Sequence, residues 1–138
     1  MAEALMKRTL NTLGKKGIAV GSAGIAAVSG TPPTDETAEA MHEAGIDVTA
    51  HRATDISDAL IKDSDLILVM EQVHKQEVIR RVPGAANKTF LLKEYAYPGG
   101  VPNPAMYGIQ DPIGWGAGYY RHTREVINKE IERIALAV

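Results

Sequence analysis

DSDLILVM, residues 63–70, is the stretch that decides the fold class of this chain. Leu66 to Met70 are apolar without interruption, so a strand formed there needs cover on both of its faces. Strands of that kind are typical of parallel sheets that carry helices on either side. Residues 89–92, Thr-Phe-Leu-Leu, predict a second buried strand further along the chain.

Helical patterns alternate with these strands along the chain, which predicts an α/β layered fold. Apolar side chains recur at helical spacing over residues 2–13, and Gly14 is a suitable stop. Ile18 to Val20 is predicted as a further short strand. Further helices are expected over residues 36–44, around residues 56–61, over residues 71–81, and from Tyr119 to near the end of the chain.

Length and composition bound the function classes. The 138 residues favour a single domain, and the formal net charge of −2 gives no general attraction to nucleic acid or to anionic membranes. The chain has no cysteine, which excludes disulfides and thiolate metal sites. No apolar run approaches the ~20 residues of a membrane span, so a cytoplasmic location without membrane contact is the default expectation. His42, His74 and His122 show no convincing metal spacing, and no metal or other cofactor is expected.

Several segments together resemble the low-molecular-weight protein tyrosine phosphatase family, including its bacterial protein-arginine phosphatase branch. They are MAEAL at 1–5, SAG at 22–24, GIDVTAHRA at 45–53, DSDLILVM at 63–70, FLLKEY at 90–95 and DPIG at 111–114. Each segment alone is weak, but their order and spacing are specific. The resemblance covers residues 1–138 as one domain.

This resemblance implies a three-layer helix-sheet-helix fold with a parallel sheet of strand order 2-1-3-4. In the family, a Cys-x5-Arg-Ser-Pro loop follows the first strand and leads into a segment similar to MAEAL. The expectation is therefore that the first strand and this phosphate loop are missing from the chain. Two compensations are expected: the second strand closes directly against the third, or self-association covers the gap with another copy.

The resemblance also assigns roles to residues of this sequence. Asp111, followed by Pro112, matches the acid that protonates the leaving group of the substrate. Ser22 and His51 match positions that support the phosphate loop. Ile113 stands at the substrate wall, where it matches neither the tyrosines nor the aromatic residues of the two branches. Trp115 is an alternative wall, although an aromatic residue at a helix start is more often part of the core.

The implied activity is dephosphorylation of phosphotyrosine or phosphoarginine, in proteins or small phosphomonoesters, through a phosphocysteine intermediate. A chain without the cysteine and arginine of the loop is expected to be inactive, because the acid alone does not replace the nucleophile. One alternative is a non-catalytic relative that binds a partner or a phosphorylated ligand. An arsenate reductase of the same fold is a weaker alternative, because those enzymes need several cysteines.

Overall fold

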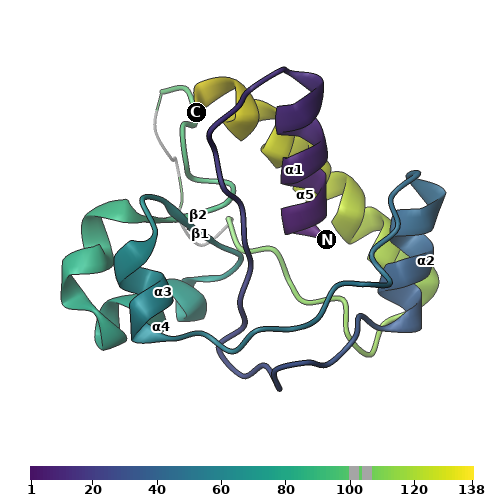
Figure 1. Ribbon diagram of the computed structural model, residues 1–138, viewed down its shortest axis with the longest axis horizontal. Helices are drawn as coiled ribbons and strands as arrows, with labels where there is room; N and C mark the ends of the chain where they lie inside the picture. Colours follow the sequence, from purple (N-terminus) through teal and green to yellow (C-terminus); the bar gives the residue numbers. More distant parts are fainter. Residues whose placement is uncertain (100–102, 104–106) are drawn as a thin grey trace.

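The computed structural model describes residues 1–99, 103 and 107–138 (Figure 1). Helices and strands alternate in the second half of the chain, as the sequence predicts, whereas the first three elements are all helices. In chain order the elements are α1 (Ala2–Thr12), α2 (Asp35–Glu43), α3 (Asp58–Asp63), β1 (Ile67–Val69), α4 (Gln72–Arg81), the 3₁₀ helix η1 (Pro83–Lys88), β2 (Thr89–Leu91) and α5 (Ala117–Ala137).

The two strands form a small parallel sheet, in which Leu68 is paired with Phe90. They are the third and fourth strands of the order that the resemblance implies, and their pairing agrees with it. Successive side chains of β1 point to opposite faces, as the period of a strand requires. Val69 packs in a cluster with Ile61 and Val78, whereas Leu68 packs against a second cluster that includes residues of α1 and α5.

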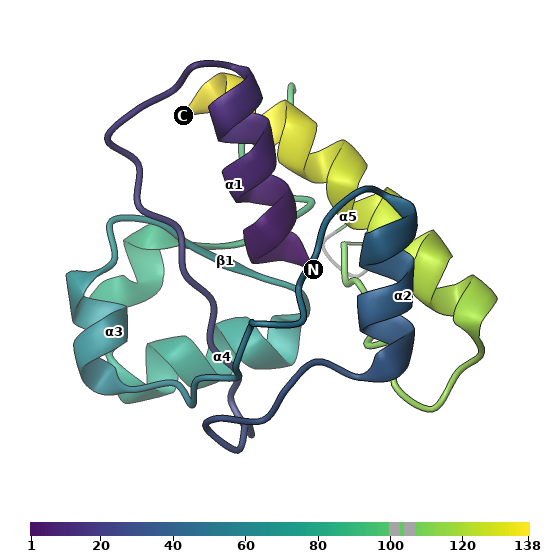
Figure 2. The same ribbon diagram turned by 45° about the vertical axis from the view of Figure 1, so that its right-hand side comes forward.

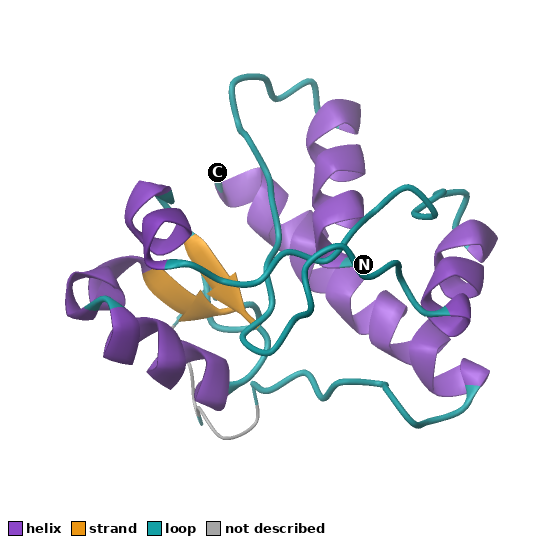
Figure 3. Ribbon diagram, turned by 60° about the horizontal axis from the view of Figure 1, so that its bottom comes forward, coloured by secondary structure: helices purple, strands orange, loops and turns teal. Residues whose placement is uncertain are grey.

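The sheet is therefore covered on both faces, which confirms the prediction from the uninterrupted apolar run. Figure 3 shows the strands between α3 and α4 on one side and the longer helices on the other. In Figures 1 and 2, α1 lies along α5. Leu5 and Leu10 of α1 share their core cluster with Ile127, Ile131 and Ile134 of α5.

Short-range signals fix the ends of α2. The Thr34 side chain accepts a hydrogen bond from the Thr37 N–H at 3.2 Å, which caps the first turn. At the other end Gly45 has a φ of 76°, a left-handed conformation that favours glycine and stops the helix. The helix therefore forms within one residue of the predicted range 36–44 at both ends.

The strand predicted over Ile18 to Val20 does not form, and this expectation was wrong. A strand needs the edge of a neighbour to bond with, and the described part of the chain places no strand beside these residues. Gly17, at a φ of 79°, turns the backbone just before them. Closure against β1 is therefore not observed, and the chain instead makes an isolated parallel bridge between Gly24 and Asp55. Self-association stays a prediction.

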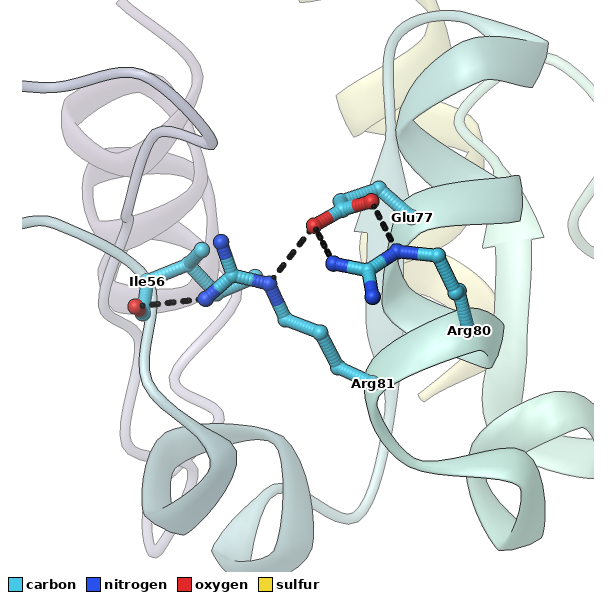
Figure 4. A network of polar contacts seen from close by, with 4 residues as sticks. All are labelled: Ile56, Glu77, Arg80 and Arg81. Carbon is cyan, nitrogen blue, oxygen red and sulfur yellow. Dashed lines mark hydrogen bonds and ion pairs between the residues drawn. The ribbon is translucent and has the colours of Figure 1, made fainter.

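An ion-pair network joins α4 to the segment that precedes α3 (Figure 4). The Arg80 guanidinium donates to both carboxylate oxygens of Glu77, at 2.8 and 2.7 Å. Arg81 donates through Nε to Glu77 at 2.8 Å and through Nη1 to the Ile56 carbonyl at 3.1 Å. The hydrogen bonds from Arg80, followed by those from Arg81, lower the pKa of Glu77 to about 2.

We expect the Glu77 carboxylate to titrate near pH 2 in a carbon-detected NMR titration. A depressed pKa in the folded state adds stability that is complete above the unfolded value and is lost as pH falls toward 2. Between about pH 4.5 and 2, the unfolding free energy of Glu77→Gln should therefore decrease less with falling pH than that of the unchanged chain. Glu39→Gln, at an exposed position of α2, is the control. An unchanged pH dependence in the Glu77 variant would contradict the network.

Candidate functional site

The carboxyl end of β1 is continued by two backbone contacts. The Val69 carbonyl accepts from the Leu92 N–H at 2.8 Å, and the Met70 carbonyl accepts from the Ile109 N–H at 2.8 Å. Ile109 is buried in the same cluster as Leu92. The segment that leads to Asp111 is thereby fixed at the carboxyl end of the sheet, where open α/β sheets bind their ligands.

Asp111 lies in a tight turn just beyond this contact. Its Oδ1 accepts a hydrogen bond from the Ile113 N–H at 3.0 Å, and the Trp115 N–H donates to the Pro112 carbonyl at 3.0 Å. Gly114, at a φ of 82°, allows the turn to close. The Asp111 side chain stays exposed. An exposed carboxyl group on a constrained turn is suited to exchanging a proton with a bound substrate.

Ser22 and His51 are brought together by a third residue, Glu3 of α1. Ser22 Oγ donates to Glu3 Oε2 at 2.5 Å, and His51 Nδ1 lies 3.9 Å from the same oxygen. Lys7 Nζ donates to Glu3 Oε1 at 2.5 Å. The carboxylate of Glu3 therefore bonds the Ser22 loop to the first turn of α1, and the His51 ring lies beside the same carboxylate.

The charge state of Glu3 follows from these contacts. Burial acts to raise its pKa, but hydrogen bonds from Lys7 and Ser22, together with the charges of Lys7 and His51, outweigh burial and lower it. Glu3 is thus an anion near neutral pH. Sequence reasoning missed its role, although the spacing of Glu3 and Lys7 is that of an ion pair on one helix face.

The two parts of the candidate site border one core cluster. Met1 and Ala2, at the start of α1, pack against the cluster that also receives Val20, Met70 and buried Ile109. Figure 2 shows the carboxyl end of β1 on the side of the molecule where α1 begins. The start of α1 and Ile109, two residues before Asp111, therefore border the same core cluster.

The predicted substrate wall is exposed. Ile113 is 64% exposed and Trp115 is 55% exposed, so placing Trp115 in the core was wrong. The physical reason is that α5 begins at Ala117, and Trp115 lies in the turn outside it. Tyr120 is the buried aromatic residue at this end of α5. Trp115 instead stacks on Tyr119, with ring centroids 5.2 Å apart and an angle of 24° between the planes.

The described ranges hold neither a metal-binding cluster nor a helix that could span a membrane. There, no group of three or more histidine, aspartate or glutamate side chains is arranged to hold a metal ion. None of the helices in the same ranges combines the length and the apolar character that crossing a bilayer requires.

Comparison with known proteins points to one family. The model of the family described as low molecular weight phosphotyrosine protein phosphatase matches residues 1–138. The probable low molecular weight protein-tyrosine-phosphatase EpsP of Ralstonia nicotianae is 40% identical over 132 residues, which are 96% of this chain and 81% of that protein. The protein-arginine-phosphatase of Geobacillus stearothermophilus is 31% identical over 119 residues, 86% of this chain and 76% of that protein.

Solved structures share the fold. A YwlE mutant from Bacillus subtilis superposes with a TM-score of 0.87 at 28% identity, over 99% of this chain and 86% of that chain. A low molecular weight protein tyrosine phosphatase from T. tengcongensis superposes with a TM-score of 0.87 at 30% identity, over 99% of this chain and 88% of that chain. The small parallel sheet and its covering helices therefore belong to a known α/β arrangement.

Proposed function

Because the chain belongs to the low molecular weight phosphotyrosine protein phosphatase family, we propose that it carries the proton donor and the supporting residues of a protein phosphatase site. The substrate class is a protein phosphorylated on tyrosine or arginine. The relatives named above include one phosphatase of each kind, and both substrates stay within the proposal. The observation that supports it most is the backbone contact that fixes the Asp111 segment at the carboxyl end of β1.

In this proposal each residue has a distinct task. In a complete site of this family a cysteine thiolate, which these 138 residues do not supply, attacks phosphorus, and Asp111 donates a proton to the departing oxygen or nitrogen. Water then hydrolyses the phosphocysteine with Asp111 as the base. Ser22, which is hydrogen-bonded to Glu3, and His51 beside the same carboxylate support the loop that surrounds the phosphate. Ile113 provides an apolar wall beside the substrate ring or guanidinium group.

The 138 residues contain no cysteine, and we propose that a polypeptide of only these residues does not turn over phosphomonoesters. A general acid contributes ~10²–10⁴-fold to a rate. Removing the nucleophile of a protease costs on the order of 10⁶-fold, which is more than the acid supplies. An exposed carboxyl group without a nucleophile should therefore leave only background hydrolysis.

The test adds the nucleophile to the chain. A segment with the family's first strand and Cys-x5-Arg-Ser-Pro loop is joined ahead of Met1, and hydrolysis of p-nitrophenyl phosphate and of phosphoarginine is measured with and without it. Activity should appear only with the added segment and should disappear when its cysteine is changed to serine. Robust turnover by a contaminant-free preparation of the 138-residue polypeptide would refute the proposal that it is inactive.

Asp111 is tested in the completed chain with two substrates that differ in their leaving groups. Asp111→Asn should lower kcat/KM by ~10²–10⁴-fold for phenyl phosphate, whose leaving group needs a proton. The loss should be smaller for p-nitrophenyl phosphate, because nitrophenolate leaves more easily without one. Asp58→Asn, at the exposed start of α3, is the control. It should leave kcat/KM nearly unchanged for both substrates. Equal losses for both substrates would argue against proton donation.

The lack of cysteine favours a second candidate, a non-catalytic relative that binds a phosphorylated partner. The same experiment separates the two functions. If the completed chain stays inactive while it folds normally, the binding function is the better account.

A further inference from the structure

We propose that Trp115 and Tyr119 form a docking platform for an aromatic side chain that flanks the phosphorylated residue of a polypeptide substrate. The proposal rests on the proposed function, because it places the phosphorylated residue at Asp111. It adds a preference for the sequence around that residue, which the proposed function leaves open.

The platform is a rigid pair of rings on the surface. Trp115 stacks on Tyr119 with centroids 5.2 Å apart, yet 55% of Trp115 is exposed. The Tyr119 hydroxyl donates to Gln110 Oε1 at 3.3 Å, which fixes the ring against the segment that leads to Asp111. The His122 ring lies 6.3 Å from Tyr119 on the same helix. Trp115, just before α5, and Tyr119 and His122 in the first turns of α5 therefore form a continuous group of three rings.

The platform is continuous with the Asp111 turn. The Trp115 N–H donates to the Pro112 carbonyl, and Ile113, 64% exposed, lies between Asp111 and Trp115 in the chain. A polypeptide whose phosphorylated side chain reaches Asp111 must pass over neighbouring surface. The adjacent surface on this side is the exposed face of Ile113 and Trp115, so it is suited to contact a residue next to the phosphorylated one.

An aromatic side chain fits this platform better than an aliphatic or charged one. Exposed rings that are already stacked present a flat apolar face at a small cost in conformational entropy. Stacking of a further ring should tighten binding by about 2- to 12-fold over alanine. The rim formed by Gln110 and His122 is polar, as is common around an apolar contact.

The test uses the 138-residue polypeptide and two blocked peptides, Gly-Ser-Phe-Ser-Gly and Gly-Ser-Ala-Ser-Gly. Trp115 is the single tryptophan, so its indole N–H gives one assignable signal in a nitrogen-proton NMR spectrum. We expect the phenylalanine peptide to shift this signal and the Tyr119 amide, with a Kd about 2- to 12-fold below that of the alanine peptide. Equal binding of the two peptides, or no shift at Trp115, would overturn the platform.

Variants separate the platform from general apolar attraction. Trp115→Ala should abolish the phenylalanine preference as read at the Tyr119 amide, and Trp115→Phe should retain part of it. Val28→Ala removes an apolar side chain that is 75% exposed and should leave the preference intact. Loss of the preference in the Val28 variant would overturn the proposal. NMR shifts of Trp115 and Tyr119 that change on dilution without peptide would also overturn the proposal, because they would assign this face to contact with a second copy of the chain.

Binding and turnover can fail separately. The peptide titration needs no nucleophile, so a completed chain that stays inactive while the preference persists contradicts only the proposed function. An active completed chain with equal kcat/KM for phosphopeptides flanked by phenylalanine or alanine contradicts only the platform.

Discussion

Ile134→Ala is expected to lower the free energy of unfolding by about 2–5 kcal/mol, measured by urea denaturation followed by circular dichroism. Ile134 is fully buried, at 0% exposure, in the cluster where α5 packs against Leu5 and Leu10 of α1. Truncation removes buried apolar area and leaves a cavity, because helices on both sides hold the surrounding side chains in place. The free energy of unfolding of a small domain is about 5–15 kcal/mol in total, so the variant should lose a large part of its stability.

Leu136→Ala is the matched control on the same helix. Leu136 is 70% exposed, and its replacement should change the unfolding free energy by no more than about 0.5 kcal/mol. Both changes replace a branched aliphatic residue by alanine, so the gain in helix propensity is similar and small. The difference between the variants therefore measures burial. Equal effects would contradict the packing of α5 against α1.

The parts of the fold that sequence predicted are those set by local pattern. The uninterrupted run at Leu66 to Met70 predicts a strand covered on both faces, and Leu68 and Val69 indeed pack into different clusters. Thr34 caps the start of α2 and Gly45 ends it, so the helix lies within one residue of the predicted range 36–44. In these elements, neighbouring residues carry enough information to decide the conformation.

The parts that sequence did not predict depend on partners elsewhere in the chain. Ile18 to Val20 has the composition of a strand, but without an adjacent edge its backbone groups have no ladder to join. The core position expected for Trp115 was wrong, because its burial depends on where α5 begins. The helix begins at Ala117 and leaves Trp115 outside it. The role of Glu3 was not predicted, since only the folded chain brings Ser22 and His51 close to it.

For the candidate site, the resemblance identified Asp111, Ser22 and His51, and the folded chain added Glu3 and the contacts that position these residues. The Asp-Pro pair at 111–112 was identified through its resemblance to a family segment. Its position at the carboxyl end of β1 follows from the contact between Ile109 and Met70, which no local pattern contains. Residues that act on the same ligand are joined by long-range contacts, and these contacts are what a single sequence reveals least.

Arg133 of α5 anchors the chain that leaves β2. Its Nη2 donates to the Leu92 carbonyl at 3.1 Å and to Glu130 Oε2 at 2.8 Å, and its Nη1 donates to the Tyr95 carbonyl. The guanidinium also lies 5.6 Å from the centre of the Tyr97 ring. Only 22% of the Arg133 side chain is exposed. The carbonyls and the carboxylate that accept its hydrogen bonds would therefore have limited access to water if the arginine were removed.

Arg133→Met should therefore lower the free energy of unfolding by about 1.5–3 kcal/mol, because carbonyls and a carboxylate lose a charged donor while the apolar stem is kept. Arg121→Met is the control: Arg121 is 50% exposed and pairs with Glu43 at 3.4 Å, a surface contact that contributes at most about 1 kcal/mol. Urea denaturation gives both values, and hydrogen exchange should show faster opening of residues 92–97 only in the Arg133 variant. If both variants lose the same small amount, the guanidinium does not hold this turn, and packing of Tyr95 against Phe90 must be what keeps it on the sheet.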